Sequence, residues 1–259
     1  MSSTMHRVDY DRIAHLYDEP GRDYLADAEL LRFLQQKAGG EPASLRALDL
    51  GCGTGKQLAA DHARLPRLRL VGLDRFHGML KQARRRCSAL DWVQGDGISL
   101  PFPTSSFDYI TNQFSYHHVP DKARLFSEIY RILKPGGRLV ITNLDPWSMP
   151  GWSIYRYFPA AHARDLADFL PEDRLIPLMQ QTGFRRVHVR RQMQRSEQTL
   201  GEFLAYTSQR HRTSQLIAIP EKEYSAGLDL IRESIGRDGS DARLPEELCL
   251  IWLIADKPA

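Results

Sequence analysis

The residues with the clearest chemical potential are three glycines spaced two apart, Gly51, Gly53 and Gly55, which follow Asp49. The apolar run at 45–50 predicts a buried parallel strand before them, and the helical spacing of apolar residues at 56–64 predicts a helix after them. Glycines in such a turn accept a positive φ and let a ligand lie against bare main chain. The first amides of the following helix point at the same place. The stretch therefore predicts a ligand site at the end of the strand.

Three kinds of ligand use a glycine turn of this type, and the spacing separates them. A Walker loop needs Ser or Thr after Gly-Lys, but Gln57 follows Lys56, and Leu50 stands where an earlier glycine is needed. A dinucleotide site needs Gly-x-Gly-x-x-Gly, whereas this chain has Gly-x-Gly-x-Gly. S-adenosylmethionine fits better, because a carboxylate at Asp49 would repel a pyrophosphate and attract the ammonium of the methionine moiety. A tight turn without a ligand is the remaining alternative.

Two further acids follow predicted strands of the same sheet. Asp74 ends the strand at 68–74, roughly 20 residues past the turn, where a nucleotide fold places the carboxylate that binds ribose hydroxyls. Asp96 follows the strand at 90–94, and its carboxylate can accept from an adenine amino group while the Gly97 amide reaches a ring nitrogen. Either acid could instead cap a helix or a turn. Because the carboxyl ends of parallel strands line one crevice, we interpret the three acids as one site.

An α/β fold would position these residues, and the remaining sequence has the alternation of strands and helices that indicates such a fold. Further strands are expected at 107–112 and 138–143, with amphipathic helices at 76–87 and 122–133 between strands. This alternation is typical of a doubly wound, Rossmann-like sheet. Residues 1–44 are expected to form a helical arm, with helices at 8–17 and 24–36, that either covers a sheet edge or closes over a ligand.

Length and composition are consistent with this fold class. The 259 residues suit one large α/β domain or a core with an insertion, and 42% hydrophobic residues allow a full core. A net charge of +3 does not require a nucleic-acid partner. The three scattered cysteines lack metal-ligand spacing, so we expect no metal and a reduced, cytoplasmic protein. Residues 1–7 have no apolar core of a signal peptide, and the apolar run at 248–255 is too short to span a bilayer.

The motifs together resemble those of class I S-adenosylmethionine-dependent methyltransferases, and more narrowly the branch of ubiquinone/menaquinone-type C-methyltransferases and small-molecule methyltransferases. The matching segments stand in the family's order at 47–55, 72–74, 95–97, 100–102, 107–110, 117–121 and 131–137. The resemblance implies a seven-stranded sheet whose last strand runs antiparallel, with 183–189 as the sixth strand and 247–255 as the seventh.

The resemblance also implies a cofactor-binding set drawn from the strand ends and their neighbours. Asp49 and the turn amides would hold the methionine part of S-adenosylmethionine, Asp74 the ribose hydroxyls, and Asp96 with Gly97 the adenine. The full expected set is Tyr17, Asp49, Gly51, Cys52, Gly53, Asp74, Arg75, Met79, Asp96, Gly97, Asn112 and Gln113.

Catalysis of methyl transfer depends first on placing the acceptor in line behind the methyl group, and such orientation can supply about 7–11 kcal/mol. A base is needed only if the acceptor must lose a proton. His117 and His118 are the candidates, because an imidazole titrates near neutral pH. The family often carries histidine here without that role. Tyr10 and Tyr17 are candidates for a lid.

Two segments exceed the smallest family members. Residues 145–167 are rich in aromatics, which either line an acceptor pocket or form core under a lid. Residues 195–245 are expected to be a helical insertion, with helices at 197–210 and 221–236, that serves as a substrate lid. The expected domains are the arm at 1–44, the methyltransferase core at 45–194 and 246–259, and this insertion.

Absent motifs narrow the acceptor. Residues 112–115 do not form the Asn/Asp-Pro-Pro-Tyr motif that resembling enzymes use on amino groups of DNA bases or glutamine, and no Pro-Cys pair marks a cytosine C5 nucleophile. The arginines between 185 and 195 alternate between two faces of a strand, which indicates solvation rather than nucleic-acid binding. We expect a small-molecule acceptor, no DNA, no membrane, and a monomer or homodimer. The alternatives are a tRNA methyltransferase and a non-catalytic S-adenosylmethionine-binding regulator.

Overall fold

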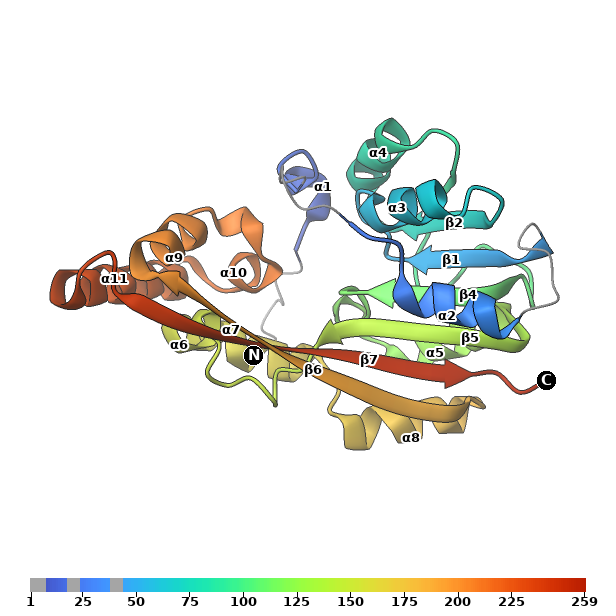
Figure 1. Cartoon of the computed structure of the whole chain (residues 1–259). Helices are drawn as coiled ribbons and strands as arrows, with labels where there is room; N and C mark the ends of the chain where they lie inside the picture. The colour runs from blue at the N-terminus through green and yellow to red at the C-terminus, as the bar shows by residue number, and fades with distance from the viewer. Residues whose placement is uncertain (1–7, 18–23, 38–43) are drawn as a thin grey trace, which may run out of the picture. The chain divides into compact units, whose positions relative to one another are not determined.

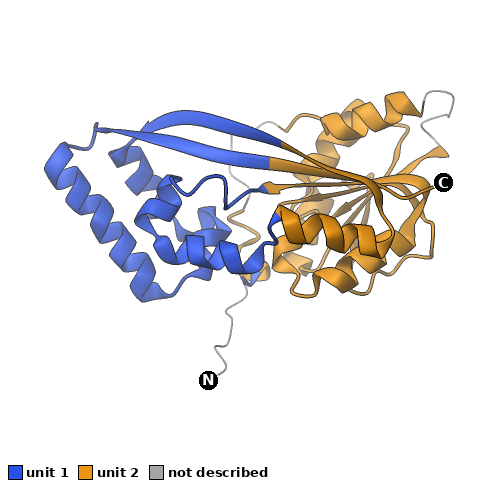
Figure 2. Cartoon of the chain, turned by 90° about the horizontal axis from the view of Figure 1, so that it is seen from below, with its two compact units in different colours: residues 1–9, 144–171, 191–250 blue, residues 10–143, 172–190, 251–259 orange. Residues whose placement is uncertain are grey.

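A computed structural model of the chain describes residues 8–17, 24–37 and 44–259. Contacts divide it into two compact units, shown in Figure 2. Unit 2 contains residues 10–143, 172–190 and 251–259, and unit 1 contains 144–171 and 191–250 together with the residues before Tyr10. The stretch at 1–7, on which the signal-peptide expectation rests, lies outside the described residues, as do 18–23 and 38–43 of the expected arm.

A seven-stranded sheet in the order β3-β2-β1-β4-β5-β7-β6 runs through the fold (Figure 1). Its strands are β1 Arg46–Leu50, β2 Arg69–Asp74, β3 Asp91–Gln94, β4 Phe107–Gln113, β5 Leu133–Leu144, β6 Arg185–Thr199 and β7 Arg243–Asp256. The pairs β1–β2, β2–β3, β1–β4 and β4–β5 are parallel. Main-chain bonds join Gly136 to Lys257 and Asp145 to Cys249, so β7 runs antiparallel to β5. The expected Rossmann-like sheet with an antiparallel last strand is confirmed.

The helices of unit 2 cover both faces of its part of the sheet. They are α1 Tyr10–Ile13, α2 Ala28–Gln36, α3 Lys56–Arg64, α4 His77–Arg86, the 3-10 turn η2 Tyr116–His118, α5 Lys122–Ile132 and α8 Glu172–Thr182. Leu58 of α3 and Leu80 of α4 join Leu70 and Trp92 of the strands in one buried cluster, and Figure 1 shows α5 and α8 on the other face. Cover on both faces explains why β1 and β2 are continuous apolar runs.

The helices of the arm are shorter than predicted. A helix was expected from 24, but α2 begins at Ala28 because the Asp27 side chain caps it by accepting from the Glu29 amide at 2.9 Å. The helix expected over 8–17 is the single turn α1. Residues 24–27 are therefore an extended lead into α2 rather than part of it.

Strand β6 extends well beyond the predicted end at 189, as far as Thr199. The helix expected from 197 begins only at Leu200, because Thr199 and Glu202 form a reciprocal capping box at that point. The side chains of residues 190–198 are mostly exposed, and apolar and polar residues do not alternate along this run. The hydrophobic pattern therefore does not predict a strand there.

Unit 1 joins the aromatic segment to the helical insertion. Its helices are α6 Ser153–Tyr157, α7 Pro159–Asp168, α9 Leu200–Thr207, the 3-10 turn η3 Arg210–Arg212, α10 Ser214–Ala218 and α11 Glu221–Asp238. Phe158 stacks on Tyr224 of α11 with ring centroids 6.0 Å apart, and Tyr157 lies 5.4 Å from Phe203 of α9. These aromatics are buried and form a core, whereas Trp147 is 42% exposed. The contacts thus group 144–171 with the insertion, a division that differs from the predicted domain boundaries.

Candidate functional site

The glycine turn after β1 has one open position. Gly51, Gly53 and Gly55 have φ values of 80°, 53° and 74°, which favour glycine. A Cβ on Gly51 would lie 2.2 Å from Ser115 Oγ, whereas a Cβ on Gly53 would meet nothing within 4 Å. The Gly51 and Cys52 amides both donate to the Leu73 carbonyl, at 2.7 and 3.0 Å. The main chain at Gly53 therefore borders space that a ligand can fill.

Asp49 is a buried carboxylate without a full set of partners. Its side chain, at the end of β1, is 3% exposed, and its Oδ1 accepts no hydrogen bond from any described residue. Burial raises the pKa of Asp49 well above its usual range, and the nearby acids Asp61, Asp27 and Asp74 raise it further. An unsatisfied buried acceptor is costly unless something binds it. The chemistry of this oxygen fits the ammonium group of S-adenosylmethionine.

Two acids beside Asp49 were missed by the sequence analysis. Asp61 of α3 is 1% exposed and accepts from the Asp27 amide at 2.7 Å and from Gln57 Nε2 at 3.1 Å. Burial raises the pKa of Asp61 to about 7. The Asp27 carboxylate accepts from the Tyr109 hydroxyl at 2.9 Å. Asp61 stands three residues after the buried Leu58. Helical periodicity therefore places both side chains on the inner face of α3, and this spacing could have identified Asp61.

Asp74 is held by the main chain of the turn. Its Oδ2 accepts from the Gly53 amide at 2.8 Å and its Oδ1 from the Phe76 amide at 2.9 Å. Burial raises the pKa of Asp74 above its usual value. Each carboxylate oxygen keeps a further lone pair for a hydroxyl donor. Asp74 therefore couples the glycine turn to the start of α4 and can still accept from a ribose.

The residues expected around the adenine lie next along the same sheet edge. The Gly95 amide donates to the Asp74 carbonyl at 3.0 Å, which brings β3 beside β2 at their ends. Asp96 Oδ1 accepts from the Ile98 amide at 3.2 Å, and its Oδ2 lies 3.6 Å from Arg75. A Cβ on Gly97 would lie 3.0 Å from Leu125 of α5. Met79 of α4 is buried.

Asn112 has a structural use that the sequence did not reveal. Its Nδ2 donates to the Leu50 carbonyl at 2.7 Å and to Ser115 Oγ at 2.6 Å, and its Oδ1 accepts from the Tyr116 amide at 2.8 Å. The side chain thus ties the end of β1 to the loop after β4. Gln113 is half-buried, and its side chain makes no hydrogen bond within the described part of the chain.

The two histidines have different surroundings. His117 is buried, its Nδ1 lies 3.1 Å from Asn143 Nδ2, and burial lowers its pKa well below the usual range, with His118 and Lys122 adding to the effect. His118 is half-buried, and its Nε2 lies 2.9 Å from the Tyr10 hydroxyl. The two imidazole rings are 3.9 Å apart. His117 is therefore neutral at neutral pH.

The arm contacts this sheet edge through α1. Tyr10 packs against Phe76 and Tyr17 with ring centroids 5.3 and 5.9 Å apart. Asp11 Oδ1 accepts from the Gly78 amide in the first turn of α4, at 2.6 Å. Tyr17 itself is 42% exposed. The arm thus lies beside Asp74 and His118, where a lid over a ligand would be.

The described ranges contain neither a metal-binding cluster nor a membrane-spanning helix. No cluster of three His, Cys, Asp or Glu residues there could hold a metal ion. No helix in the same ranges is long and apolar enough to cross a membrane.

Comparisons with known proteins agree with this geometry. Residues 48–141 match the model of a family described as a methyltransferase domain. A ubiquinone/menaquinone biosynthesis C-methyltransferase from Desulfotalea psychrophila is 35% identical over 141 residues, covering 53% of this chain and 57% of the relative. A demethylmenaquinone methyltransferase from Thermus thermophilus is 37% identical over 110 residues, covering 41% of this chain and 50% of the relative. The chain thus spans about half the length of the curated relatives it matches.

A solved structure shares the fold at lower identity. Phosphoethanolamine N-methyltransferase 2 from Haemonchus contortus superimposes with a TM-score of 0.60 at 20% identity, covering 100% of this chain and 61% of that one. Strand order and turn geometry define a class I S-adenosylmethionine-dependent methyltransferase fold. Residues 48–141 match the methyltransferase domain family, and the resemblance to class I S-adenosylmethionine-dependent methyltransferases drawn from the motifs is confirmed.

Proposed function

We propose that this protein is an S-adenosylmethionine-dependent methyltransferase that transfers a methyl group to a small-molecule acceptor. The observation that carries the proposal is Asp49, a buried carboxylate whose Oδ1 has no partner among the described residues, beside a turn with open space at Gly53. A cationic, phosphate-free nucleoside satisfies this carboxylate, whereas a pyrophosphate would be repelled. The matched methyltransferase domain supports the same ligand.

The geometry of unit 2 supports a set of proposed cofactor contacts. When bound, S-adenosylmethionine supplies a methyl group that its sulfonium already activates. Asp49 and the amides of the turn would hold its amino acid part, Asp74 its ribose hydroxyls, and Asp96 with Gly97 its adenine. The remaining contacts would come from Arg75, Tyr17 and Gln113 at the rim and from the buried Met79. Asn112 would act through the loop that it ties to β1, since its amide groups are already bonded within the protein.

We propose His118 rather than His117 as the base when the acceptor must lose a proton. His118 is half-buried and bonded to the Tyr10 hydroxyl, so it can exchange a proton at the rim of the site. Burial disfavours the charged form of His117. Tyr10 would orient the His118 ring and help α1 exclude water.

The acceptor is proposed from the names of the relatives. Two of them are named for quinone biosynthesis and for demethylmenaquinone, so a demethylated quinone is the first acceptor class to test. We also propose that the helices at 195–245 serve as a substrate lid, because an insertion of that length in a compact fold usually has a function.

Labelled turnover tests the proposed function. The protein would be incubated with methyl-labelled S-adenosylmethionine and either a demethylmenaquinone analogue or a metabolite extract, and the label should enter an extractable small molecule. The Asp49→Asn variant should lose the signal, while Asp91→Asn, an exposed acid at the start of β3, should keep it. Label in RNA would indicate that the acceptor is a tRNA and not a small molecule. Cofactor binding without turnover on any acceptor would indicate a regulator.

A further inference from the structure

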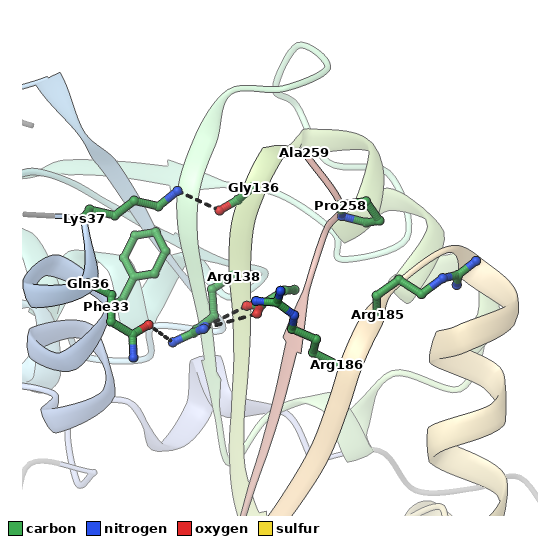
Figure 3. Close-up of a pocket in the computed structure, with 10 residues that line it drawn as sticks. Phe33, Gln36, Lys37, Gly136, Arg138, Arg185, Arg186, Pro258 and Ala259 are labelled. Atoms are coloured by element: carbon green, nitrogen blue, oxygen red, sulfur yellow. Dashed lines mark hydrogen bonds and ion pairs between the residues drawn. The ribbon is translucent and has the colours of Figure 1, made fainter.

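Unit 2 contains a cavity whose lining is strongly basic (Figure 3). Its volume is about 510 Å³, and it is formed by α2, the start of β5, the start of β6 and the segment that ends β7. Its charged side chains are Lys37, Arg138, Arg185, Arg186 and Asp256. The lining thus includes four cationic side chains and one acidic side chain, whereas acids line the proposed cofactor edge.

This cavity lies at the other end of the strands from the glycine turn. Arg138 lines it, while Asn143, five residues further along β5, contacts His117 beside the proposed cofactor. A strand rises about 3.3 Å per residue, so these two positions are roughly 17 Å apart. The cavity is therefore separate from the cofactor site.

The cations of the cavity are unevenly neutralised. The charge of Arg138 is paired, because Asp256 accepts from its Nε and Nη2 at 2.7 and 3.2 Å, and Gln36 accepts from its Nη1 at 3.0 Å. Lys37 Nζ donates at 2.9 Å to the Gly136 carbonyl, which carries no charge. The Arg186 side chain makes no hydrogen bond or ion pair with the described residues, although the Arg186 carbonyl lies 3.0 Å from His188 Nδ1. Lys37 and Arg186 consequently bring positive charge that the Asp256 side chain, already paired with Arg138, does not balance.

Arg186 is also held in a costly backbone conformation. Its φ of 51° lies in the left-handed region, which a non-glycine residue rarely adopts. Such outliers persist where the surrounding structure holds them, and they concentrate at ligand sites. Arg185, by contrast, donates to the carbonyls of Gln180 and Phe184, and Figure 3 shows its guanidinium turned away from the cavity.

We propose that this cavity binds a small molecule bearing a phosphate group, with Lys37 and Arg186 as its direct contacts. A guanidinium presents paired donors that match phosphate oxygens, and an ammonium adds a point charge beside it. Two unbalanced cations suit a dianion better than a single carboxylate. Arg138 and Asp256 neutralise each other, and the hydrogen bond from Arg138 to Gln36 would hold the Gln36 amide beside the ligand.

Titration calorimetry on the full chain tests this site, with inorganic pyrophosphate as the probe and acetate as the monoanionic comparison. We expect saturable pyrophosphate binding that weakens at least tenfold in Arg186→Gln and in Lys37→Gln. Acetate should bind far more weakly. The matched control Arg85→Gln removes an exposed arginine on α4 and should leave the affinity within twofold.

A glycine variant separates loss of the ligand contact from loss of fold. Arg186→Gly removes the guanidinium and relieves the backbone at φ 51°, so it should lose pyrophosphate binding without lowering the melting temperature. Absence of pyrophosphate binding to the unaltered protein, or equal affinity in Arg186→Gln and the unaltered protein, would overturn the proposal. Saturating S-adenosylhomocysteine should leave the pyrophosphate affinity unchanged, and competition between the two ligands would place the phosphate at the glycine turn instead.

Discussion

At the scale of single residues, the proposed cofactor site contains acids, Asp49 and Asp74 among them, that are buried in the unliganded fold. Asp49 and Asp74 could be found from the sequence because each ends an apolar strand, and the ends of neighbouring strands share an edge. Asp61 ends no strand, and within the polar helix α3 only its spacing of three residues from Leu58 indicated that it faces inward. The three bonds of Asn112 depend on a loop conformation that no local pattern encodes.

The buried acid Asp61 should give the unliganded protein a characteristic pH dependence. Its pKa is about 7 in the folded state and about 3.9 in an unfolded chain, so between these values the folded state keeps a proton that the unfolded state has lost. The free energy of unfolding should therefore fall as pH rises from about 4 to 7, by up to about 4 kcal/mol from this one group. Asp61→Asn should flatten the profile.

Urea unfolding at several pH values between 4 and 7 measures this effect. The exposed Asp91→Asn provides the control, and its profile should run parallel to that of the unaltered protein. Parallel profiles for Asp61→Asn and the unaltered protein would show that Asp61 does not carry the bound proton.

At the scale of elements, β1 to β4 and α3 to α5 agree with the predicted bounds to within one residue, because the apolar period is regular there, whereas β5 begins at Leu133 instead of 138. Strand β6 extends beyond its predicted end, because from Arg190 onward its sequence lacks the alternation of apolar and polar residues that indicates a strand. The glycine turn is the element on which the site depends. Its conformation could be predicted from three glycines, but the packing of Ser115 on Gly51 could not, because 64 positions separate them in the sequence.

Alanine at Gly51 and at Gly53 should have different consequences. Both substitutions place a side chain at positive φ, which costs about 1–2 kcal/mol. Gly51→Ala should cost at least about 1 kcal/mol more, because its Cβ would displace Ser115 and disturb the Ser115 hydrogen bonds to Leu50 and Asn112. Gly53→Ala should instead reduce S-adenosylmethionine affinity, since its Cβ enters the open space.

Thermal unfolding and calorimetry on both variants distinguish these effects. A second substitution, Ser115→Gly, should recover part of the stability lost in Gly51→Ala and none of the stability lost in Gly53→Ala. Equal destabilisation by the two alanines, with no recovery, would contradict the packing of Ser115 on the turn.

At the scale of the whole molecule, the chain forms two compact units, and the proposed cofactor contacts all belong to unit 2. The sequence predicted the helices of the insertion, but not that residues 144–171 pack with them. That grouping depends on Phe158 and Tyr157 meeting α11 and α9, which lie more than 40 residues later in the sequence. Non-local contacts of this kind leave no local pattern to predict from.

Truncation of Phe158 should weaken unit 1 while leaving cofactor binding intact. Phe158 is buried against Tyr224 and Gly227, so Phe158→Ala should lower the free energy of unfolding by about 3–5 kcal/mol. Because no proposed cofactor contact lies in unit 1, S-adenosylmethionine affinity should stay within twofold, while turnover should fall if the insertion serves as a substrate lid. Chemical denaturation, calorimetry and the labelled assay measure the three quantities, and a tenfold loss of cofactor affinity would contradict the assignment of binding to unit 2.

The central claim is that a buried carboxylate at the end of β1 binds a cationic nucleoside, and calorimetry with S-adenosylmethionine on Asp49→Asn tests it most directly. Because Asp49 Oδ1 lacks a partner in the described chain, the unliganded variant should be at least as stable as the unaltered protein. Its affinity for S-adenosylmethionine should nevertheless fall about 10- to 100-fold, since a charge-assisted hydrogen bond is lost. An unchanged dissociation constant in this stably folded variant would contradict the account.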